Sequence, residues 1–457
     1  FVQRFVASPY DDREHLGRLD WQPTDKDHLF TRYFYQSLDQ QAYTGDIASG
    51  NYVNSVDKVH TIGADWTHSF SPNWADQLRY SFQQAKLAYQ DGGLPNCTIS
   101  SPDNCPADIG IGSGFEGFGL QNGYPQGRVV KVTQVQNNAT WTRGRQTILF
   151  GGEIDSQNSP LTGLANYAGS FFYNDFNSFI SNAPGPGQPN YDAELALAFG
   201  DITTKYKETD LAGYIQDDWQ VTPNLTAHIG LRWEYFSPAF NVLHDQTVAR
   251  ESNPATAIWD PTLPLADRTF PKMQQFRKGF EPRLGVAWNP AFDSKLVIKA
   301  GYAMDRDPVF YNLATMSAGF APVANAGTIF CTGGSSCLPS GGDISAGAVR
   351  GLNAPLLPGG GDPRMLDQIT IPSNLMPPYT QTYTLAIDHQ IGKAAVGEVR
   401  YVGSLTQKNF QSVDANPYLL PVQTDFASFV PGTLCSDRNG VGCGRPDSSS
   451  SITSTVI

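Results

Sequence analysis

Apolar and polar positions alternate in many segments of this chain. Between Leu225 and Tyr235 every second residue is apolar. The residues between them are Thr226, His228, Gly230, Arg232 and Glu234. A period of two is that of a β-strand with two chemically different faces. The same alternation returns at 73–83 and 379–388, so the pattern predicts antiparallel β structure through much of the chain.

The alternating segments occur as six predicted hairpins. Each turns at short runs of Pro, Gly, Asn, Asp or Lys, as at Thr222-Pro223-Asn224. The predicted hairpins are His15–Gln41, Val56–Tyr89, Arg128–Asn158, Tyr206–Ser237, Glu281–Met304 and Tyr379–Ser404. The third is the most polar. Long irregular stretches separate them, in which we expect short helices at 191–200 and 304–313.

Short and long connections alternate strictly between these segments. Such long connections are foreign to compact soluble domains but typical of outer-membrane barrels, which have short periplasmic turns and long extracellular loops. The chain contains no apolar run of about 18 residues, so no transmembrane helix is expected. The expected fold class is all-β: a partial antiparallel transmembrane β-barrel of about twelve strands in six hairpins. A soluble β-sandwich is the competing fold, because its strands also alternate.

Tryptophans cluster near the predicted short turns. Barrels carry girdles of aromatic side chains at the membrane interfaces. We expect such a girdle on the periplasmic side, made of Trp21, Trp66, Trp74, Trp141, Trp219 and Trp288. Tryptophan also favours strand ends in other β proteins, which is the alternative explanation.

Charge and cysteine content limit the possible partners and the cellular compartment of the protein. The net charge of -12 and the absence of a basic run argue against a nucleic-acid partner. The six cysteines form close pairs in Gly/Pro/Ser-rich stretches, which favours disulfides in an oxidising compartment. The disulfide candidates are Cys97 with Cys105, Cys331 with Cys337, and Cys435 with Cys443; pairing between segments stays open.

No motif predicts covalent chemistry. The pattern at 112–117 formally fits a dinucleotide loop but lacks the strand and helix that such a loop requires. The histidines show no metal-ligand spacing, so we expect no enzyme, no cofactor and no metal. His228, Arg232 and Glu234 are candidate lumen-facing residues, either in a solvated lumen or along a substrate path.

Four stretches of the sequence resemble the TonB-dependent outer-membrane receptors, in particular the large type with a carboxypeptidase-regulatory-like domain before its plug. They are GRLDWQPTDKDHLFTRYFY at 17–35, LAGYIQDDWQVTPNLTAHIGLRWEYFSP at 211–238, EPRLGVAWNP at 281–290 and YTQTYTLAIDHQIGKAAVGEVRYVGS at 379–404. The resemblance implies a Gram-negative outer-membrane barrel of about 22 strands, closed by a plug and energised through TonB.

Residues 1–457 are therefore expected to be an internal part of one barrel domain, without the plug, the N-terminal domain or the barrel's C-terminus. The expected function is uptake of a scarce nutrient, such as a siderophore, cobalamin, oligosaccharide or peptide. The expected partners are outer-membrane lipid, the plug and the TonB system, with a small-molecule or oligomeric substrate of unknown identity. A non-transporting surface or adhesion protein on the same scaffold is the alternative.

Overall fold

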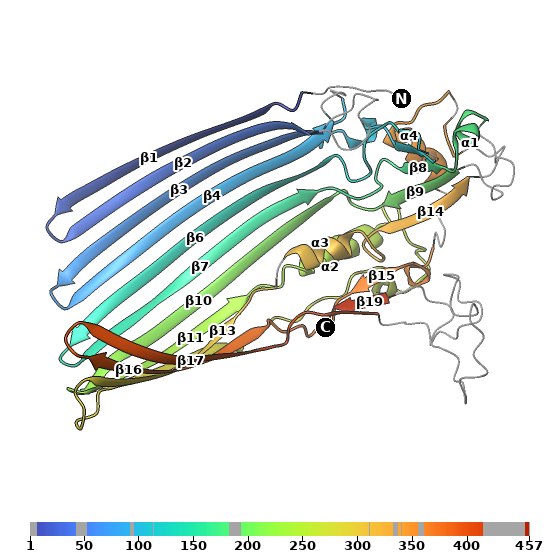
Figure 1. Cartoon of the computed structure of the whole chain (residues 1–457). Coiled ribbons are helices and arrows are strands. Elements are labelled where there is room, and N and C mark those ends of the chain that lie inside the picture. Colours follow the sequence, from blue (N-terminus) through green and yellow to red (C-terminus); the bar gives the residue numbers. More distant parts are fainter. Residues whose placement is uncertain are drawn as a thin grey trace, which may run out of the picture.

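The computed structural model describes ten stretches of the chain. They are residues 7–42, 53–91, 96–112, 114–181, 193–309, 311–331, 337–339, 341–354, 361–414 and 453–456. Within them, one antiparallel sheet of 12 strands dominates the molecule, in the order β1-β2-β3-β4-β6-β7-β10-β11-β12-β13-β16-β17 (Figure 1). The expected all-β fold class and its six hairpins are confirmed.

The strands of this sheet are long. Their bounds are β1 Tyr10–Thr24, β2 Asp27–Ala42, β3 Val53–Ser71, β4 Trp74–Asp91, β6 Gln126–Arg143, β7 Gln146–Thr162, β10 Thr203–Thr222, β11 Leu225–Phe236, β12 Gly279–Trp288, β13 Leu296–Arg306, β16 Tyr379–Ile391 and β17 Ala395–Gln407. Most exceed the 9–11 residues that cross a bilayer at a tilt, so they extend beyond it. The polar third hairpin, β6 with β7, is paired like the others.

All six short turns lie at one end of the sheet, and the long connections lie at the other (Figure 1). Two or three residues join the strands of five hairpins, and residues 289–295 join β12 to β13. Polar side chains hold several of these turns. The side chain of Asn224, for example, donates to the carbonyl of Asn289 in the next turn at 2.9 Å.

Register partners on neighbouring strands point to the same face of a sheet. One row of successive partners runs through Asp65, Arg79, Gln136, Glu153, Ala212 and Glu234. The adjacent row runs through Trp66, Leu78, Asn137, Gly152, Gly213 and Trp233. The first row belongs to what we call the polar face and the second to the apolar face. The apolar face carries many large exposed side chains, including Ile215 and Leu231.

The long connections together form what we call the cap. Part of the cap is a second, four-stranded sheet beyond the loop ends of the barrel strands (Figure 1). This cap sheet consists of β14 Asn325–Cys331, β9 Ala193–Phe199, β8 Ser170–Tyr173 and β5 Asp108–Ile111. One of its faces is a hydrophobic core in which Phe171, Tyr173, Leu195 and Leu197 are almost fully buried. Helix α4, Ala346–Asn353, adds Val349 to that core.

A second hydrophobic cluster joins β10 to the connections after β11 and β13. Helices α2 Asn241–Glu251 and α3 Tyr311–Ala318 contribute to it, and Phe240, Leu243 and Phe270 are its buried centre. The remaining short elements are η1 Pro102–Asn104, α1 Phe176–Ser181, η2 Leu265–Arg268, η4 Pro363–Met365, β15 Gln368–Thr370, β18 Ser412–Asp414 and β19 Thr453–Val456. None of the helices that the structure describes is long and apolar enough to cross a membrane, which does not bear on crossing by strands.

The helix expected at 191–200 is wrong. The described part of that stretch is strand β9, paired with β8 on one side and β14 on the other. Ala193, Leu195 and Leu197 of β9 are buried, which follows the period of two of a strand. Packing against distant strands overrides the helix propensity of Leu and Ala. The second expected helix is displaced, because β13 continues to Arg306 and α3 begins at Tyr311.

The packing of the cap sheet yields a stability prediction. Leu195→Ala removes a side chain that is 0% exposed, and such a cavity costs about 2–5 kcal/mol. Limited proteolysis of the full-length protein should then cut the cap connections much faster than in the wild type, while the barrel strands stay protected. Leu231→Ala is the matched control, since this leucine is 44% exposed on the apolar face. Equal cleavage of both variants would contradict the assigned core.

Candidate functional site

The polar face of the large sheet carries a chain of ion pairs and hydrogen bonds. Near its first strands, Asp65 lies almost buried, with 4% of its side chain exposed. Its carboxylate accepts from Arg79 Nε at 2.9 Å and from Gln77 Nε2 at 2.7 Å. Phe30, Arg32, Gln134 and Gln136 line a shallow hollow together with this pair. The hollow therefore offers both a cation and amide groups to a polar ligand.

Farther along the same face, Arg232 lies among carboxylates. Its guanidinium donates to Glu234 Oε1 at 2.5 Å and lies 3.9 Å from Glu153 Oε2. Glu281 is its register partner on β12 and is 1% exposed. That carboxylate accepts the backbone N–H of Arg306 at 3.1 Å. Arg232 thus pairs with two carboxylates, and the buried Glu281 lies opposite it on β12.

Single ion pairs continue the polar face toward its last strands. Arg283 pairs with Asp305, and Lys299 with Asp388, each at 2.5 Å. His228 Nδ1 lies 2.7 Å from Asp218 Oδ1 on the neighbouring strand. Arg283 and His228 also line a shallow hollow with Gln216, Thr382 and Thr384.

The structure places the three candidate lumen residues on the polar face of β11. It brings Arg232 and Glu234 into contact, whereas His228 pairs with Asp218 nearer the short turn. Sequence reasoning assigned no role to Asp65, Glu153 or Glu281. The signal for Glu281 was its place two residues before Arg283 in an alternating segment, but alternation alone does not reveal which strands are neighbours.

All six candidate girdle tryptophans lie on the apolar face near the short turns. Trp21 and Trp66 are each paired in register with Leu29, and Trp74 with Trp141. Trp219 and Trp288 lie on the same face through their partners Ala227 and Leu225. Large amphipathic rings grouped toward one end of the strands are typical of side chains at a membrane interface.

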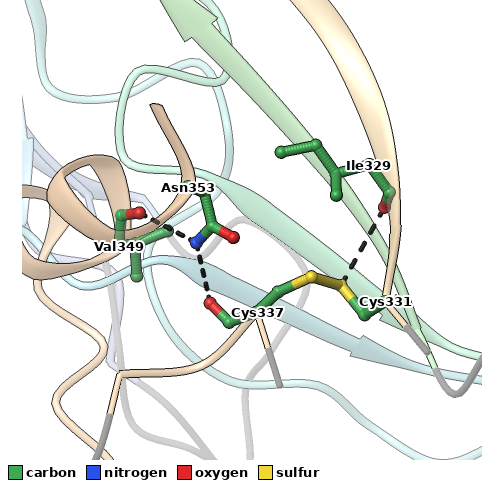
Figure 2. The surroundings of a disulfide bond; sticks show 5 residues. All are labelled: Ile329, Cys331, Cys337, Val349 and Asn353. Carbon is green, nitrogen blue, oxygen red and sulfur yellow. Dashed lines mark hydrogen bonds between the residues drawn. A yellow bond between two sulfur atoms is a disulfide. The ribbon is translucent and has the colours of Figure 1, made fainter. Parts of the chain in front are cut away.

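Two disulfides lie in the cap. Cys97 is joined to Cys105, and Cys331 at the end of β14 to Cys337. Figure 2 shows the second bridge beside α4, where the amide of Asn353 donates to the carbonyls of Cys337 at 2.7 Å and Val349 at 2.9 Å. The third candidate pair, Cys435 with Cys443, lies outside the described residues.

Arg350 of α4 ties three of the long connections together. Its guanidinium carbon lies 3.9 Å from the ring centre of Tyr167 and 4.5 Å from that of Phe199. Nη1 donates to the carbonyls of Ala198 and Tyr167. The Tyr167 hydroxyl in turn donates to Asp103 Oδ1 at 2.7 Å. Burial and this hydrogen bond raise the pKa of Tyr167 to about 12.

Within the described parts of the chain, no three His, Cys, Asp or Glu side chains group in a way that could hold a metal ion. The ion pairs described above are instead a fixed pattern of charge along a sheet face. Such a pattern can orient a polar solute or a docked protein segment by hydrogen bonds.

Comparison with known proteins places the chain in a family. The model of the outer membrane beta barrel domain matches residues 2–451, so the chain belongs to this family and is an outer-membrane β-barrel protein. The expected localisation is therefore confirmed. Transporter-like outer-membrane barrels of this kind are in general not enzymes.

Solved structures of outer-membrane transporters and receptors are similar to it at low identity. The outer membrane transporter YddB from Escherichia coli is 10% identical, with 98% of this chain and 43% of that chain covered and a TM-score of 0.49. A mutant of the ferric enterobactin receptor PfeA from Pseudomonas aeruginosa is 13% identical, with 98% of this chain and 47% of that chain covered and a TM-score of 0.48. The siderophore receptor PirA from Acinetobacter baumannii is 12% identical, with 98% of this chain and 48% of that chain covered and a TM-score of 0.46.

This chain spans less than half the length of each of these three structures. No curated protein matches the sequence.

The environment of Tyr167 yields a pH prediction. An unfolded tyrosine ionises near pH 10, and the folded cap holds the neutral phenol up to about pH 12. The folded state thus binds more protons between these values, so the cap loses stability as the pH rises from 10 to 12. The difference in 295 nm absorbance between wild type and Tyr167→Phe should titrate with a midpoint near pH 12. A midpoint near 10 would show that the phenol is solvated.

Proposed function

We propose that this chain is part of the barrel of a TonB-dependent outer-membrane receptor that takes up a scarce nutrient. The observation that carries the proposal is the polar face, where Asp65, Arg79, Glu153, Arg232 and Glu234 form paired charges across six neighbouring strands. In a barrel whose other face is apolar, such a face lines the lumen. Charges already held by partners recognise a polar solute or plug with little reordering.

The family resemblance in the sequence supports the finer parts of this proposal. It implies a plug inside the barrel, coupling to TonB, and a carboxypeptidase-regulatory-like domain in the complete protein. The substrate class is a siderophore, cobalamin, an oligosaccharide or a peptide. The residues proposed to face the lumen are His228, Arg232 and Glu234, and the six tryptophans on the apolar face are proposed as the periplasmic girdle.

A surface or adhesion protein on the same scaffold is the second candidate. The observation that favours it is the folded cap, in which two disulfides and the contacts of Arg350 fix the loops before any ligand binds. A rigid exterior surface suits protein or cell-surface contacts as well as capture of a solute.

Uptake measurements separate the two candidates. Cells that express the full-length protein should accumulate one labelled compound from a panel of ferric siderophores, cobalamin, oligosaccharides and peptides. Accumulation should stop on addition of a protonophore or on loss of TonB. Surface binding without accumulation, unchanged by the protonophore, would contradict transport and support the adhesion protein.

The polar face provides a variant for the same assay. Arg232→Met leaves the carboxylates of Glu234 and Glu153 without this cation. Uptake should fall at least tenfold, since a hydrogen bond to a charged group contributes about 1.5–3 kcal/mol. Lys393→Met, in the turn between β16 and β17, is the control and should transport normally. Unchanged uptake by the Arg232 variant would remove this cluster from the transport path.

A further inference from the structure

Five lysines lie on the apolar face of the large sheet, all toward the ends of the strands that carry the long connections. We call them the lysine belt. Its members are Lys58 on β3, Lys86 on β4, Lys131 on β6, and Lys205 and Lys207 on β10. All five side chains are exposed. They share a face with Trp66 and Leu78. Residues an even number of positions apart on one strand point to the same face, and so do register partners on neighbouring strands.

The register brings these ammonium groups close together. Lys58 and Lys86 are direct partners, whose Cβ atoms stand about 5 Å apart in such pairs. Lys131 lies two residues from Val129, the partner of Lys86, and so occupies a diagonal position about 7–8 Å away. Asn158 on β7 then separates Lys131 from Lys207. Like charges directly opposite one another destabilise a sheet unless an anion lies between them.

The described strands themselves supply little negative charge at this height. On the apolar face of β3, β4, β6, β7 and β10, the only acidic residues are Asp76 and Asp217, both near the short turns. On the next strand, Asp39 is diagonal to Lys58 and stands at the margin of the belt. None of the belt lysines forms an ion pair with a described residue, whereas Lys299 on the polar face is paired with Asp388. This arrangement stands out in a chain of net charge -12.

The belt also lies directly beside the apolar band. On β3 the sequence toward the short turn runs from Lys58 through His60 to Ile62 and Trp66, and on β4 from Lys86 to Phe82 and Leu78. The His60 imidazole shares a 2.8 Å hydrogen bond with the hydroxyl of Tyr33 at the boundary. Short turns are periplasmic in outer-membrane barrels, so the belt lies at the level of the outer-leaflet headgroups and faces the lipid.

We propose that the lysine belt binds the phosphate groups of a phosphorylated glycolipid in the outer leaflet. The ammonium groups meet the phosphates, and the band below them contacts the acyl chains of the same molecule. A soluble protein partner fits this surface less well, because the belt is continuous with side chains that face lipid. The inference does not depend on what the barrel transports.

Lipid binding by the full-length protein in detergent tests the proposal. The probes are diphosphorylated lipid A, the same lipid after enzymatic removal of its phosphates, and inorganic phosphate, with bound lipid measured by native mass spectrometry. Lys58→Gln, Lys86→Gln and Lys131→Gln combined should weaken diphosphorylated lipid A binding by roughly fivefold per lysine, the usual contribution of a basic residue near an anionic surface. Arginine at the same three positions should restore it.

The matched control removes the same charge at the opposite end of the strands. It combines Lys26→Gln, Lys295→Gln and Lys393→Gln, in or beside the short turns. This control should bind as the wild type does, and heat-dependent gel mobility should show both triple variants folded. Equal binding by the belt variant and wild type, equal loss in the control, or equal affinity for the dephosphorylated lipid would each overturn the proposal. Inorganic phosphate binding as tightly as the lipid would overturn its lipid source.

Discussion

Hydrogen bonding of the backbone in lipid is the constraint on which the rest of this structure depends. Hydrocarbon offers no partner to an unpaired N–H or C=O group, so each strand must find its partners on neighbouring strands. The sheet meets this requirement with continuous registers, such as the 17 successive partners between β10 and β7 from Thr203 to Trp219. Pairing in turn places every second side chain on the same face, which separates a lipid-facing surface from a polar one.

The two ends of the sheet then serve different purposes. At the short-turn end, residues such as Asn224 bind adjacent turns to one another. At the other end, strands that continue past the bilayer carry connections long enough to build their own core around Leu195 and Leu197. Arg350, on the connection between β13 and β16, reaches two carbonyls of the connection between β7 and β10, so these connections pack together rather than forming separate loops.

Sequence reasoning recovered the barrel sheet well and the cap poorly. Turn chemistry and alternation located all six hairpins, including polar β6, because both signals are local. The stretch containing β9 was misjudged, since its Leu and Ala residues suit a helix and only β8 and β14 beside it make it a strand. Arg232 and Glu234 were found from alternation within one strand. Glu153 and Glu281 were missed because they meet Arg232 from other strands.

The sequence by itself determined the period of two, the positions of the short turns, the tryptophans beside them and the pairing partners available to nearby cysteines. Each of these depends on residues within a few positions of one another. The tertiary structure decided which strands are neighbours, and therefore that Lys58 faces Lys86 and that Arg232 pairs with Glu153 and lies opposite Glu281. Register is a relation between distant segments, and no local pattern specifies it.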